Sequence, residues 1–365
     1  MKALHLELEN YRNYAKQRID FGSGVNVVYG DNAQGKTNIL ESVYFFAMGR
    51  SNRARTDAEL IRHGEDKARI CLEFTDSVRT NKAEAEIYRG KRKKIQINEI
   101  PIKRSSELVR RFNVVYFGPE YLSLVKDGPG VRRRNLDILI SQIKPGYMAA
   151  LAELKKIVES KNALLRMEHP NKTMLDIMDD KLASAAAGII LHRSLYISRI
   201  EGFAKTLQTD ISNGTEELEM NYKCCIGDVS GLDTEGIRAA VRAKIEESRP
   251  REMRLCEAVV GPHREDIGFL INGTEARLYA SQGQQKTIVM ANKLAEVELI
   301  RAETNEMPVL LLDDIMSELD RARREYILGH INNMQIMITC TDTDGMTVPD
   351  DACRIKVENG CAAAV

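Results

Sequence analysis

The chain lacks tryptophan and has no excess of either charge: its 365 residues include 53 Lys and Arg against 53 Asp and Glu. Without a net field to attract nucleic acid, any such contact has to come from local basic clusters. No apolar run approaches the roughly twenty residues of a membrane-spanning helix. The strand-like first eight residues lack the apolar core of a signal peptide. We therefore expect a cytoplasmic protein that does not associate with membranes.

The seven cysteines are scattered, with one adjacent pair, Cys224 and Cys225, and no C-x-x-C spacing. This usage is typical of reduced thiols, so it predicts neither a disulfide framework nor a zinc site.

What the chain does contain is one match to the phosphate-binding pattern G-x-x-x-x-G-K-[ST]. A strand-like run at 25–29 precedes it and a helix-like run at 38–46 follows it, which is the context that the pattern needs. Backbone N–H groups and the helix N-terminus would then surround phosphate oxygens. A glycine-rich surface turn is the alternative. The matching residues are Gly30, Asp31, Asn32, Ala33, Gln34, Gly35, Lys36 and Thr37.

Two side chains of this loop have predicted catalytic roles. Lys36 would reach the β- and γ-phosphates of a nucleotide, and the hydroxyl of Thr37 would bind Mg²⁺. Asn32 would orient the γ-phosphate or the attacking water, although simple turn chemistry explains it almost as well. Ala33 occupies a position where glycine is common, which should matter little if its backbone φ is negative.

A second acidic element lies near the other end of the chain. The apolar run 309–312 is followed by Asp313 and Asp314. This pattern predicts a central parallel strand whose carboxyl end delivers acids to the ligand crevice. Asp313 would hold Mg²⁺, usually through water, and Asp314 would polarise the attacking water. A buried strand capped by solvated acids is the alternative.

Composition divides the chain into three segments. Residues 1–118 are mixed and strand-rich, with Leu4, Leu6 and Leu8 expected on one face, and residues 119–260 are largely helical. Strand character returns in 261–365. Because the phosphate loop and the acidic strand lie in different segments, the first and last must fold together. We predict an α/β nucleotide-binding lobe, made of 1–118 and 261–365, with an inserted helical lobe at 119–260.

The segment 281–285, S-Q-G-Q-Q, resembles the signature of ABC-type ATPases, although a helix N-cap at Ser281 explains it in isolation. The resemblance implies a mixed-sheet head with a central helix that binds ATP and Mg²⁺. It also implies that Ser281, Gln282, Gly283 and Gln284 contact the γ-phosphate held by a second subunit. The following segment 317–320 looks like the D-loop of the same class, which crosses the dimer interface and here contains Asp320.

Longer stretches are similar to the RecF family of bacterial recombination mediators, over nearly the whole chain. They include 8–14, 49–53, 115–120, 132–137, and above all G-P-H-R at 261–264 together with S-Q-G-Q-Q. The resemblance implies a weak, DNA-stimulated ATPase that dimerises on ATP. It would bind single-stranded, gapped and double-stranded DNA, work with RecR and functionally with RecO to load RecA, and support replication restart and the SOS response. The roles of His263 and Arg264 stay open.

Other residues have weaker predicted roles. Similar heads place residues such as Arg12 and Asn13 on the nucleotide phosphates, although a solvated hairpin turn is the alternative. Glu120 occupies the region where such heads carry a metal-binding glutamine. Basic clusters are candidate contacts to the DNA backbone, although most charge runs are solvated faces. These candidates are Arg50, Arg53, Arg55, Lys91, Arg92, Lys93, Lys94, Arg132, Arg133 and Arg134.

Three rival functions remain open at this point. An SMC-like head that organises chromosomes or DNA ends would have the same ATP site and other partners. A phosphotransferase for a small metabolite would need a substrate pocket near Asp314 and no signature segment. A nucleotide-binding scaffold would scarcely hydrolyse ATP.

Overall fold

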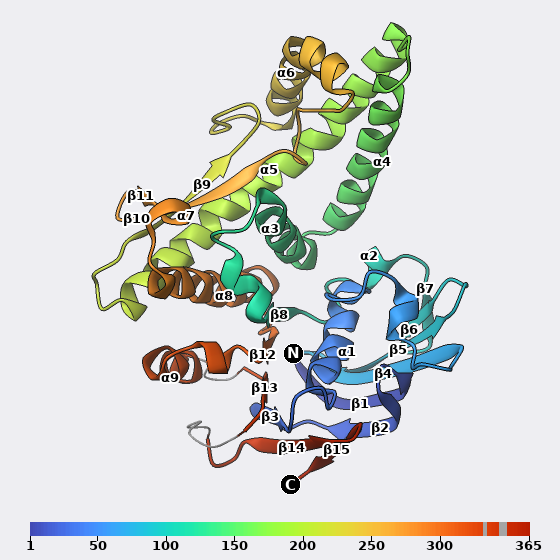
Figure 1. Ribbon diagram of the computed structural model, residues 1–365, viewed down its shortest axis with the longest axis vertical. Helices are drawn as coiled ribbons and strands as arrows, with labels where there is room; N and C mark the ends of the chain where they lie inside the picture. Colours follow the sequence, from blue (N-terminus) through green and yellow to red (C-terminus); the bar gives the residue numbers. More distant parts are fainter. Residues whose placement is uncertain (331–333, 343–348) are drawn as a thin grey trace. The chain divides into compact units, whose positions relative to one another are not determined.

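The computed structural model describes residues 1–330, 334–342 and 349–365. It divides into two compact units, shown in Figure 1. The first comprises Met1–Ser123 and Lys293–Val365, and the second comprises Leu124–Asn292. None of the helices in the described ranges is long and apolar enough to cross a membrane.

The first unit contains a six-stranded sheet that is built from both ends of the chain. Its order is β15-β14-β3-β13-β12-β8, and every pairing except β14 with β15 is parallel. Burial on both faces explains the near-continuous apolar runs of β12 and β13. Strand β3 lies between two strands from the far end of the chain, so the ends must fold together. The strands are β3 (Val25–Tyr29), β8 (Val114–Phe117), β12 (Val309–Asp313), β13 (Ile336–Cys340), β14 (Cys353–Glu358) and β15 (Cys361–Ala364).

The second sheet of this unit is antiparallel, in the order β2-β1-β4-β5-β6-β7. Strand β1 contains a register shift between Ala3 and His5. A bulge reverses the alternation of side chains, so Ala3 is buried and Leu4 is only half-buried, while Leu6 and Leu8 are buried as expected. The expectation that all three leucines share one buried face is therefore wrong at Leu4. The strands are β1 (Lys2–Tyr11), β2 (Tyr14–Asp20), β4 (Lys67–Thr75), β5 (Thr80–Tyr88), β6 (Lys94–Ile97) and β7 (Ile100–Ile102).

Helix α1 (Lys36–Met48) is the central helix of the first unit. It contacts strands of both sheets, and every residue from Ile39 to Met48 is buried. A helix that is covered all round needs apolar residues on every face, which explains the run V-Y-F-F-A-M. The remaining elements of the unit are η1 (Asp57–Leu60), α2 (Ser105–Leu108), η2 (Pro119–Ser123), the part of α8 (Gln282–Thr304) from Lys293 onward, η3 (Met316–Glu318) and α9 (Arg321–His330).

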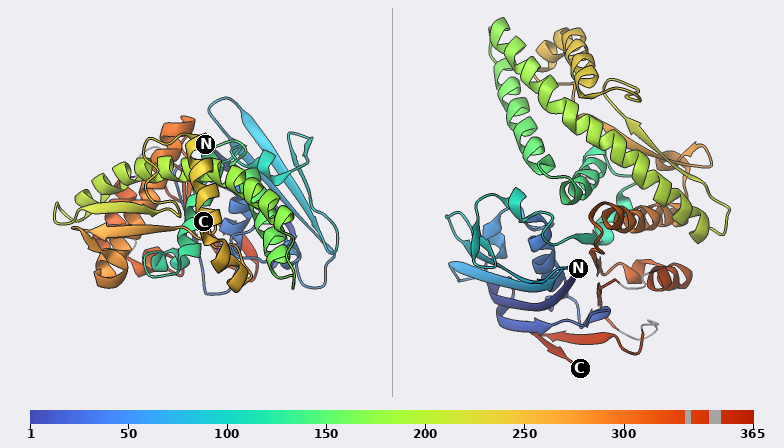
Figure 2. Two further views of the ribbon diagram at one scale, coloured as in Figure 1. Left: turned by 90° about the horizontal axis from the view of Figure 1, so that it is seen from above. Right: turned by 180° about the vertical axis from the view of Figure 1, so that it is seen from behind.

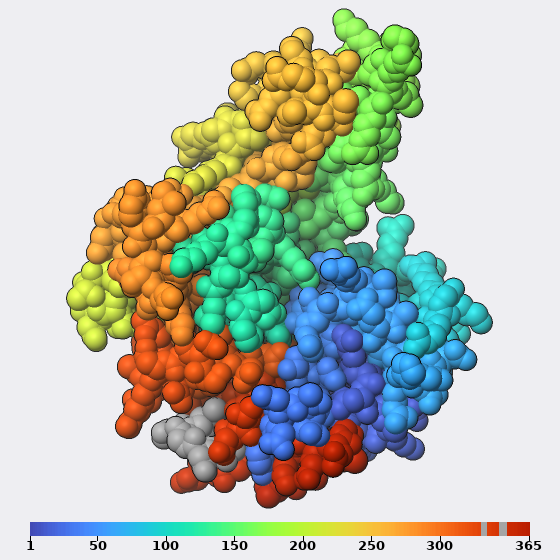
Figure 3. All heavy atoms as spheres, in the orientation of Figure 1, coloured from blue at the N-terminus to red at the C-terminus, as the bar shows by residue number. Residues whose placement is uncertain are grey.

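The two ends of the chain also meet at the edge of this unit. The side chain of Gln17 on β2 donates to the carbonyl of Ala362 at 2.7 Å and accepts from its amide at 2.9 Å. In the space-filling view, the blue N-terminal and red C-terminal atoms lie side by side (Figure 3).

The second unit is mostly helical. Its longest element is α5, capped by the side chain of Asn171, which accepts from the amide of Met174. Helices α4 and α5 lie side by side over much of their length (Figures 1 and 2). The helices are α3 (Pro129–Ile143), α4 (Tyr147–Leu165), α5 (Lys172–Ile211), α6 (Thr234–Leu255), α7 (Ala276–Tyr279) and the beginning of α8 (Gln282–Thr304).

A small sheet extends this unit past the predicted boundary. Strand β10 (Asp266–Ile271) pairs with β9 (Leu218–Lys223) and with β11 (Thr274–Glu275). Because β9 lies inside the helical segment, its hydrogen bonds keep β10 in the same compact unit. The second unit thus extends beyond residue 260. It comprises Leu124–Asn292, whereas the sequence analysis placed the helical lobe at 119–260.

Candidate nucleotide-binding and hydrolysis site

The phosphate loop connects β3 to α1, as its pattern predicts. Gly30 has φ of 145°, and a Cβ atom there would lie 2.2 Å from the carbonyl oxygen of Val357. Gly35 has φ of 116°, and its Cβ would lie 2.5 Å from the side-chain nitrogen of Asn13. Both positions thus require glycine, for backbone conformation and for space.

Ala33 corrects one expectation about this loop. Its φ is 65°, in the left-handed region, so the condition under which alanine should matter little, a negative φ, is not met. A side chain in that region costs about 1–2 kcal/mol. The loop therefore holds Ala33 in a conformation that glycine would adopt without strain.

Lys36 and Thr37 begin helix α1 and point to two different sets of oxygen atoms. The ammonium group of Lys36 donates to the carbonyl oxygens of Gly30 (2.5 Å) and Asp31 (2.8 Å), so it lies over the loop. The hydroxyl of Thr37 donates to Oδ1 of Asp313 at 2.9 Å. The structure thus brings together the loop and the acidic strand, which are far apart in the sequence.

Asp313 ends β12 at the carboxyl edge of the parallel sheet and is 4% exposed. Its Oδ1 also accepts from the hydroxyl of Thr339 (2.7 Å), and its Oδ2 accepts from that of Tyr116 (2.8 Å). A buried carboxylate beside a threonine hydroxyl is the oxygen donor set that Mg²⁺ prefers. Thr37 and Asp313 therefore fit the metal roles proposed for them.

Asp314 is held by its backbone next to this carboxylate. Its φ is 53°, and its amide donates to the hydroxyl of Thr339 at 2.8 Å. Partial burial raises the pKa of Asp314, the nearby ammonium of Lys36 opposes that rise, and the charges of Asp313 and Glu318 add to it. A carboxylate with a raised pKa accepts a proton more readily, which suits a group that polarises water.

Arg12 and Asn13 separate in the structure. Asn13 donates to the carbonyl of Gln34 at 2.6 Å, so it contacts the phosphate loop. The guanidinium of Arg12 instead makes two hydrogen bonds to Glu41, at 2.9 and 2.7 Å, and a third to the carbonyl of Glu59. In this arrangement Arg12 contacts α1 rather than the loop, which differs from its predicted position on the phosphates.

Several residues near the site were missed by sequence reasoning. Tyr116 bonds Asp313, and its ring lies edge-on to Tyr121. The ammonium of Lys293 lies 3.7 Å from the centre of the Tyr121 ring and contacts Glu296 at 3.1 Å. Burial lowers the pKa of Lys293, against the opposing effect of Glu296. The only sequence signals were a tyrosine within the apolar run and a lysine within an apolar helical stretch.

Glu120, the acid in the predicted metal-binding position, lies in the same corner of the first unit. Desolvation raises its pKa, and the charge of Asp313 adds to that rise. Glu120 and Tyr116 both approach Gly118. A Cβ atom added to Gly118 would lie 2.6 Å from Oε2 of Glu120 and 2.7 Å from the hydroxyl oxygen of Tyr116. The charge of Asp313 thus reaches the carboxyl group of Glu120.

The signature segment has the capped geometry of a helix start. The hydroxyl of Ser281 accepts from the amide of Gln284 at 3.2 Å, and Oε1 of Gln284 accepts from the amide of Ser281 at 2.9 Å. Ser281 and Gln282 are exposed, whereas Gly283 and Gln284 are half-buried. Asp320 is exposed as well, and its carboxylate accepts from the amide of Arg323 at the start of α9.

The side chains of the basic clusters differ in how far they are buried. Arg132 is 3% exposed, with a bidentate pair to Asp266 at 2.7 and 2.9 Å, so its assignment to DNA is wrong. Lys93 donates to the carbonyl of Gly49 and to Asp57, which leaves it half-buried. Arg133 donates to the carbonyl of Glu265. The exposed members of the candidate set are Arg50, Arg53, Arg55, Lys91, Arg92, Lys94 and Arg134.

His263, in the G-P-H-R segment, is largely surrounded by the protein's own atoms. Its Nε2 donates to the carbonyl of Ala258 at 3.2 Å, and its buried Nδ1 has no partner. Burial lowers the pKa of His263 to about 4, because a second proton would place a charge on that unpartnered nitrogen.

This environment predicts a pH dependence of stability. The unfolded chain protonates the histidine near pH 6.5, whereas the folded chain resists protonation until about pH 4. Stability from this group is thus complete above pH 6.5 and is lost as pH falls toward 4, by about 2 kcal/mol between pH 7 and pH 5. In urea unfolding, His263→Gln should weaken that dependence, and the exposed His169→Gln should not. Equal pH profiles for the wild type and His263→Gln would contradict the assignment.

Comparisons with known proteins place this geometry in a family. The model of the RecF/RecN/SMC N-terminal domain matches residues 3–363. The DNA replication and repair protein RecF of Ruminiclostridium cellulolyticum is 41% identical over 345 residues, which cover 93% of this chain and 92% of the relative. This chain belongs to the RecF family. RecF of Clostridium acetobutylicum is 39% identical over 359 residues, 98% of each chain.

Solved structures agree with the RecF assignment. The recombination mediator protein RecF-ATPrS of the RecFOR pathway has a TM-score of 0.94 and 34% identity, covering 100% of this chain and 98% of that one. The Smc head domain from Pyrococcus furiosus, bound to the C-terminal domain of ScpA, has a TM-score of 0.56 and 16% identity, covering 100% of this chain and 95% of that one. At this identity the likeness shows a shared fold alone. The prediction of an ABC-type ATPase head with a RecF resemblance is confirmed.

Proposed function

We propose that this chain is an ATP-controlled DNA clamp of recombinational repair. Each copy binds ATP with Mg²⁺ at its phosphate loop, and two copies associate through the signature segment. Hydrolysis then weakens the dimer and releases DNA. The hydrogen bond between Thr37 and Asp313 carries this proposal, because it joins the two metal-binding elements. Similarity to the solved RecF-ATP structure (TM-score 0.92, 35% identity, covering 100% of this chain and 97% of that one) supports ATP as the nucleotide.

The roles of the chain's own residues follow from the site. Lys36, which now contacts loop carbonyls, turns to the β- and γ-phosphate oxygens, and backbone N–H groups of 30–37 bind the rest of the triphosphate. Asp314 orients the attacking water and accepts its proton. Thr37 and Asp313 would hold Mg²⁺, which when bound would neutralise developing charge on the phosphates.

The exposed surface beside the signature supports a dimer. Leu278 and Tyr279 are 66% and 73% exposed, immediately before the exposed Ser281 and Gln282. Large apolar side chains at the surface are typical of protein interfaces. Ser281 and Gly283 would contact the γ-phosphate of the second copy, and Asp320 would lie at the same interface.

For DNA, we propose that exposed arginines contact the backbone. Arg50, Arg53 and Arg55 follow the end of α1 and are exposed. Because phosphate contacts carry no sequence information, binding should be independent of sequence and should weaken steeply with salt. Single-stranded, gapped and double-stranded DNA are the proposed ligands. RecR, RecO and RecA are the proposed protein partners in replication restart and the SOS response.

Sedimentation of the full chain with a non-hydrolysable ATP analogue tests the clamp. We expect a monomer without nucleotide and a dimer with the analogue. Ser281→Arg should prevent dimerisation while leaving nucleotide binding to the monomer unchanged, since the arginine blocks only the contact in trans. Ser184→Arg, at an exposed position on α5, should dimerise normally. A wild-type chain that stays monomeric with the analogue would instead favour a phosphotransferase.

A further inference from the structure

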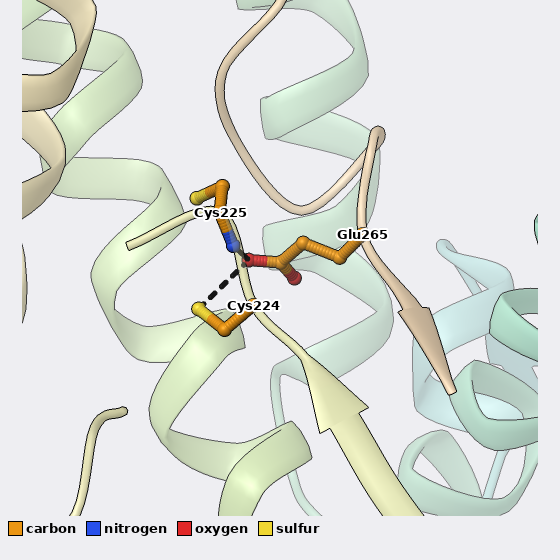
Figure 4. A group of neighbouring side chains, drawn as sticks. All are labelled: Cys224, Cys225 and Glu265. Atoms are coloured by element: carbon orange, nitrogen blue, oxygen red, sulfur yellow. Dashed lines mark hydrogen bonds between the residues drawn. The ribbon is translucent and has the colours of Figure 1, made fainter. Parts of the chain in front are cut away.

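A cluster of three metal-ligating side chains lies in the second unit, outside the nucleotide site. Sulfur atoms of Cys224 and Cys225 and a carboxylate oxygen of Glu265 all lie within 4.8 Å of one another (Figure 4). Strand pairing explains why they meet. Lys223 on β9 pairs with Asp266 on β10, so Cys224 and Glu265 are the next residues of the two antiparallel strands.

The carboxylate of Glu265 is oriented by other residues. Its Oε2 accepts from Arg193 at 3.2 Å and from the hydroxyl of Tyr222. Its Oε1 accepts from the thiol of Cys224 at 3.2 Å and from the amide of Cys225 at 3.3 Å. One oxygen is thus fixed by the protein and the other faces the thiols, and this is how outer partners commonly hold a metal-binding carboxylate.

The negative charge of Glu265 and the partial exposure of the two cysteines are also compatible with a bound cation. The side chain of Glu265 is fully buried, and its counterion Arg193 also makes a bidentate pair with Asp137, at 3.1 and 2.9 Å. Arg133 donates to the backbone carbonyl of Glu265 and leaves its carboxylate oxygens to the other partners. Cys224 and Cys225 are only half-buried, so an ion can enter from solvent and retain a water molecule.

We propose that Cys224, Cys225 and Glu265 bind one zinc ion, with water in the fourth position. Two thiolates and one carboxylate are ligand types that zinc accepts, and thiolates disfavour Mg²⁺ and Ca²⁺. Binding releases the two thiol protons to solvent, and the sulfur–zinc bonds replace the thiol hydrogen bond to Glu265. The segment 224–265 leaves the small sheet after β9, contains α6, and returns to the sheet at β10. A bound ion would link the two ends of this segment.

This site was excluded by the sequence analysis, which relied on the lack of C-x-x-C spacing. The ligands here are two adjacent cysteines and a glutamate that is distant in the sequence. Only the register of β9 with β10 brings them together, and β9 itself was not predicted. A search for local spacing patterns cannot find such a site.

Cobalt and zinc titrations of the full-length, reduced protein test the proposal. We expect one Co²⁺ per chain with a thiolate charge-transfer band, displaced by one equivalent of Zn²⁺. Affinity should rise with pH, because binding releases protons. Cys225→Ser should lose the band, and Glu265→Gln should weaken zinc binding at least tenfold. Tyr222→Phe, which removes only an orienting hydrogen bond, should weaken it about tenfold.

Matched controls make the outcome decisive. Cys256→Ser and Cys361→Ser replace cysteines outside the cluster and should keep one ion with unchanged affinity. Zinc should raise the melting temperature of the wild type by several degrees and leave that of Cys225→Ser unchanged. Because the metal-free melting temperature of each variant is measured as well, loss of folding is distinguished from loss of binding. An absent band in the folded wild type, or equal zinc affinity in Cys225→Ser, would overturn the proposal.

Discussion

Replacing Asp314 with asparagine is expected to slow ATP hydrolysis by about a hundred- to ten-thousand-fold, the usual contribution of a positioned general base. The change removes the negative charge and keeps the shape of the side chain. It also suits the backbone, since φ is 53° at this position and asparagine tolerates the left-handed region. The amide hydrogen bond to Thr339 does not involve the side chain and should persist.

The same variant should still bind ATP and dimerise, because Lys36, Thr37 and Asp313 are untouched. Single-turnover hydrolysis and sedimentation, measured on one preparation, separate the two properties. Asp20→Asn, at an exposed position at the end of β2, should hydrolyse ATP like the wild type. Retention of wild-type turnover by Asp314→Asn would remove Asp314 from the mechanism and leave the phosphate loop assignment intact.

The nucleotide site was predictable from sequence because its signals are local. Glycines at Gly30 and Gly35 are required by backbone conformation, and an apolar run followed by acids indicates a parallel strand. Both signals depend on a few consecutive residues. Their meeting was predictable too, since the sequence analysis assigned Thr37 and Asp313 to one predicted metal site, and the two side chains are hydrogen-bonded.

The misplaced residues depend on distant partners. The R-R-R run at 132–134 is typical of an exposed basic face, yet Arg132 is buried because Asp266, which begins β10, lies opposite it. The exposure of Leu4 depends on a bulge in the pairing of β1 with β4. The extent of the second unit depends on β9, a short strand between long helices. Register and tertiary pairing decide each case, and neither can be read from one segment.

The burial of three charged residues in the helical unit also depends on tertiary packing and cannot be read from one segment. Lys161 on α4, Asp179 on α5 and Glu252 on α6 are each 0% exposed. The ammonium lies 2.8 Å from Asp179 and 2.6 Å from Glu252. Asp179 also pairs with Arg249. Three charged residues in amphipathic helices would ordinarily be assigned to solvent, and only the packing of α4, α5 and α6 shows that they share one interior.

Lys161→Met is therefore expected to destabilise the helical unit by about 3–5 kcal/mol. Methionine fills nearly the same volume, but Glu252 loses its cation and Asp179 loses one of two. Urea unfolding followed by helical circular dichroism measures the change. Lys155→Met is the matched control: it lies on the same helix, is 78% exposed, and among the described residues its one ion pair is with Glu159 at 3.8 Å. Its effect should stay below about 0.5 kcal/mol.

A second substitution tests whether uncompensated charge, rather than lost packing, causes the instability. Adding Glu252→Gln to Lys161→Met removes one orphaned carboxylate. The glutamine keeps a side-chain oxygen that can accept the hydrogen bond that the amide of Val259 now donates to Glu252 at 3.1 Å. The double variant should then be more stable than the sum of the single effects predicts, by about 1–2 kcal/mol. Strict additivity would mean that Lys161 and Glu252 do not stabilise each other, and that lost packing rather than orphaned charge causes the instability of Lys161→Met.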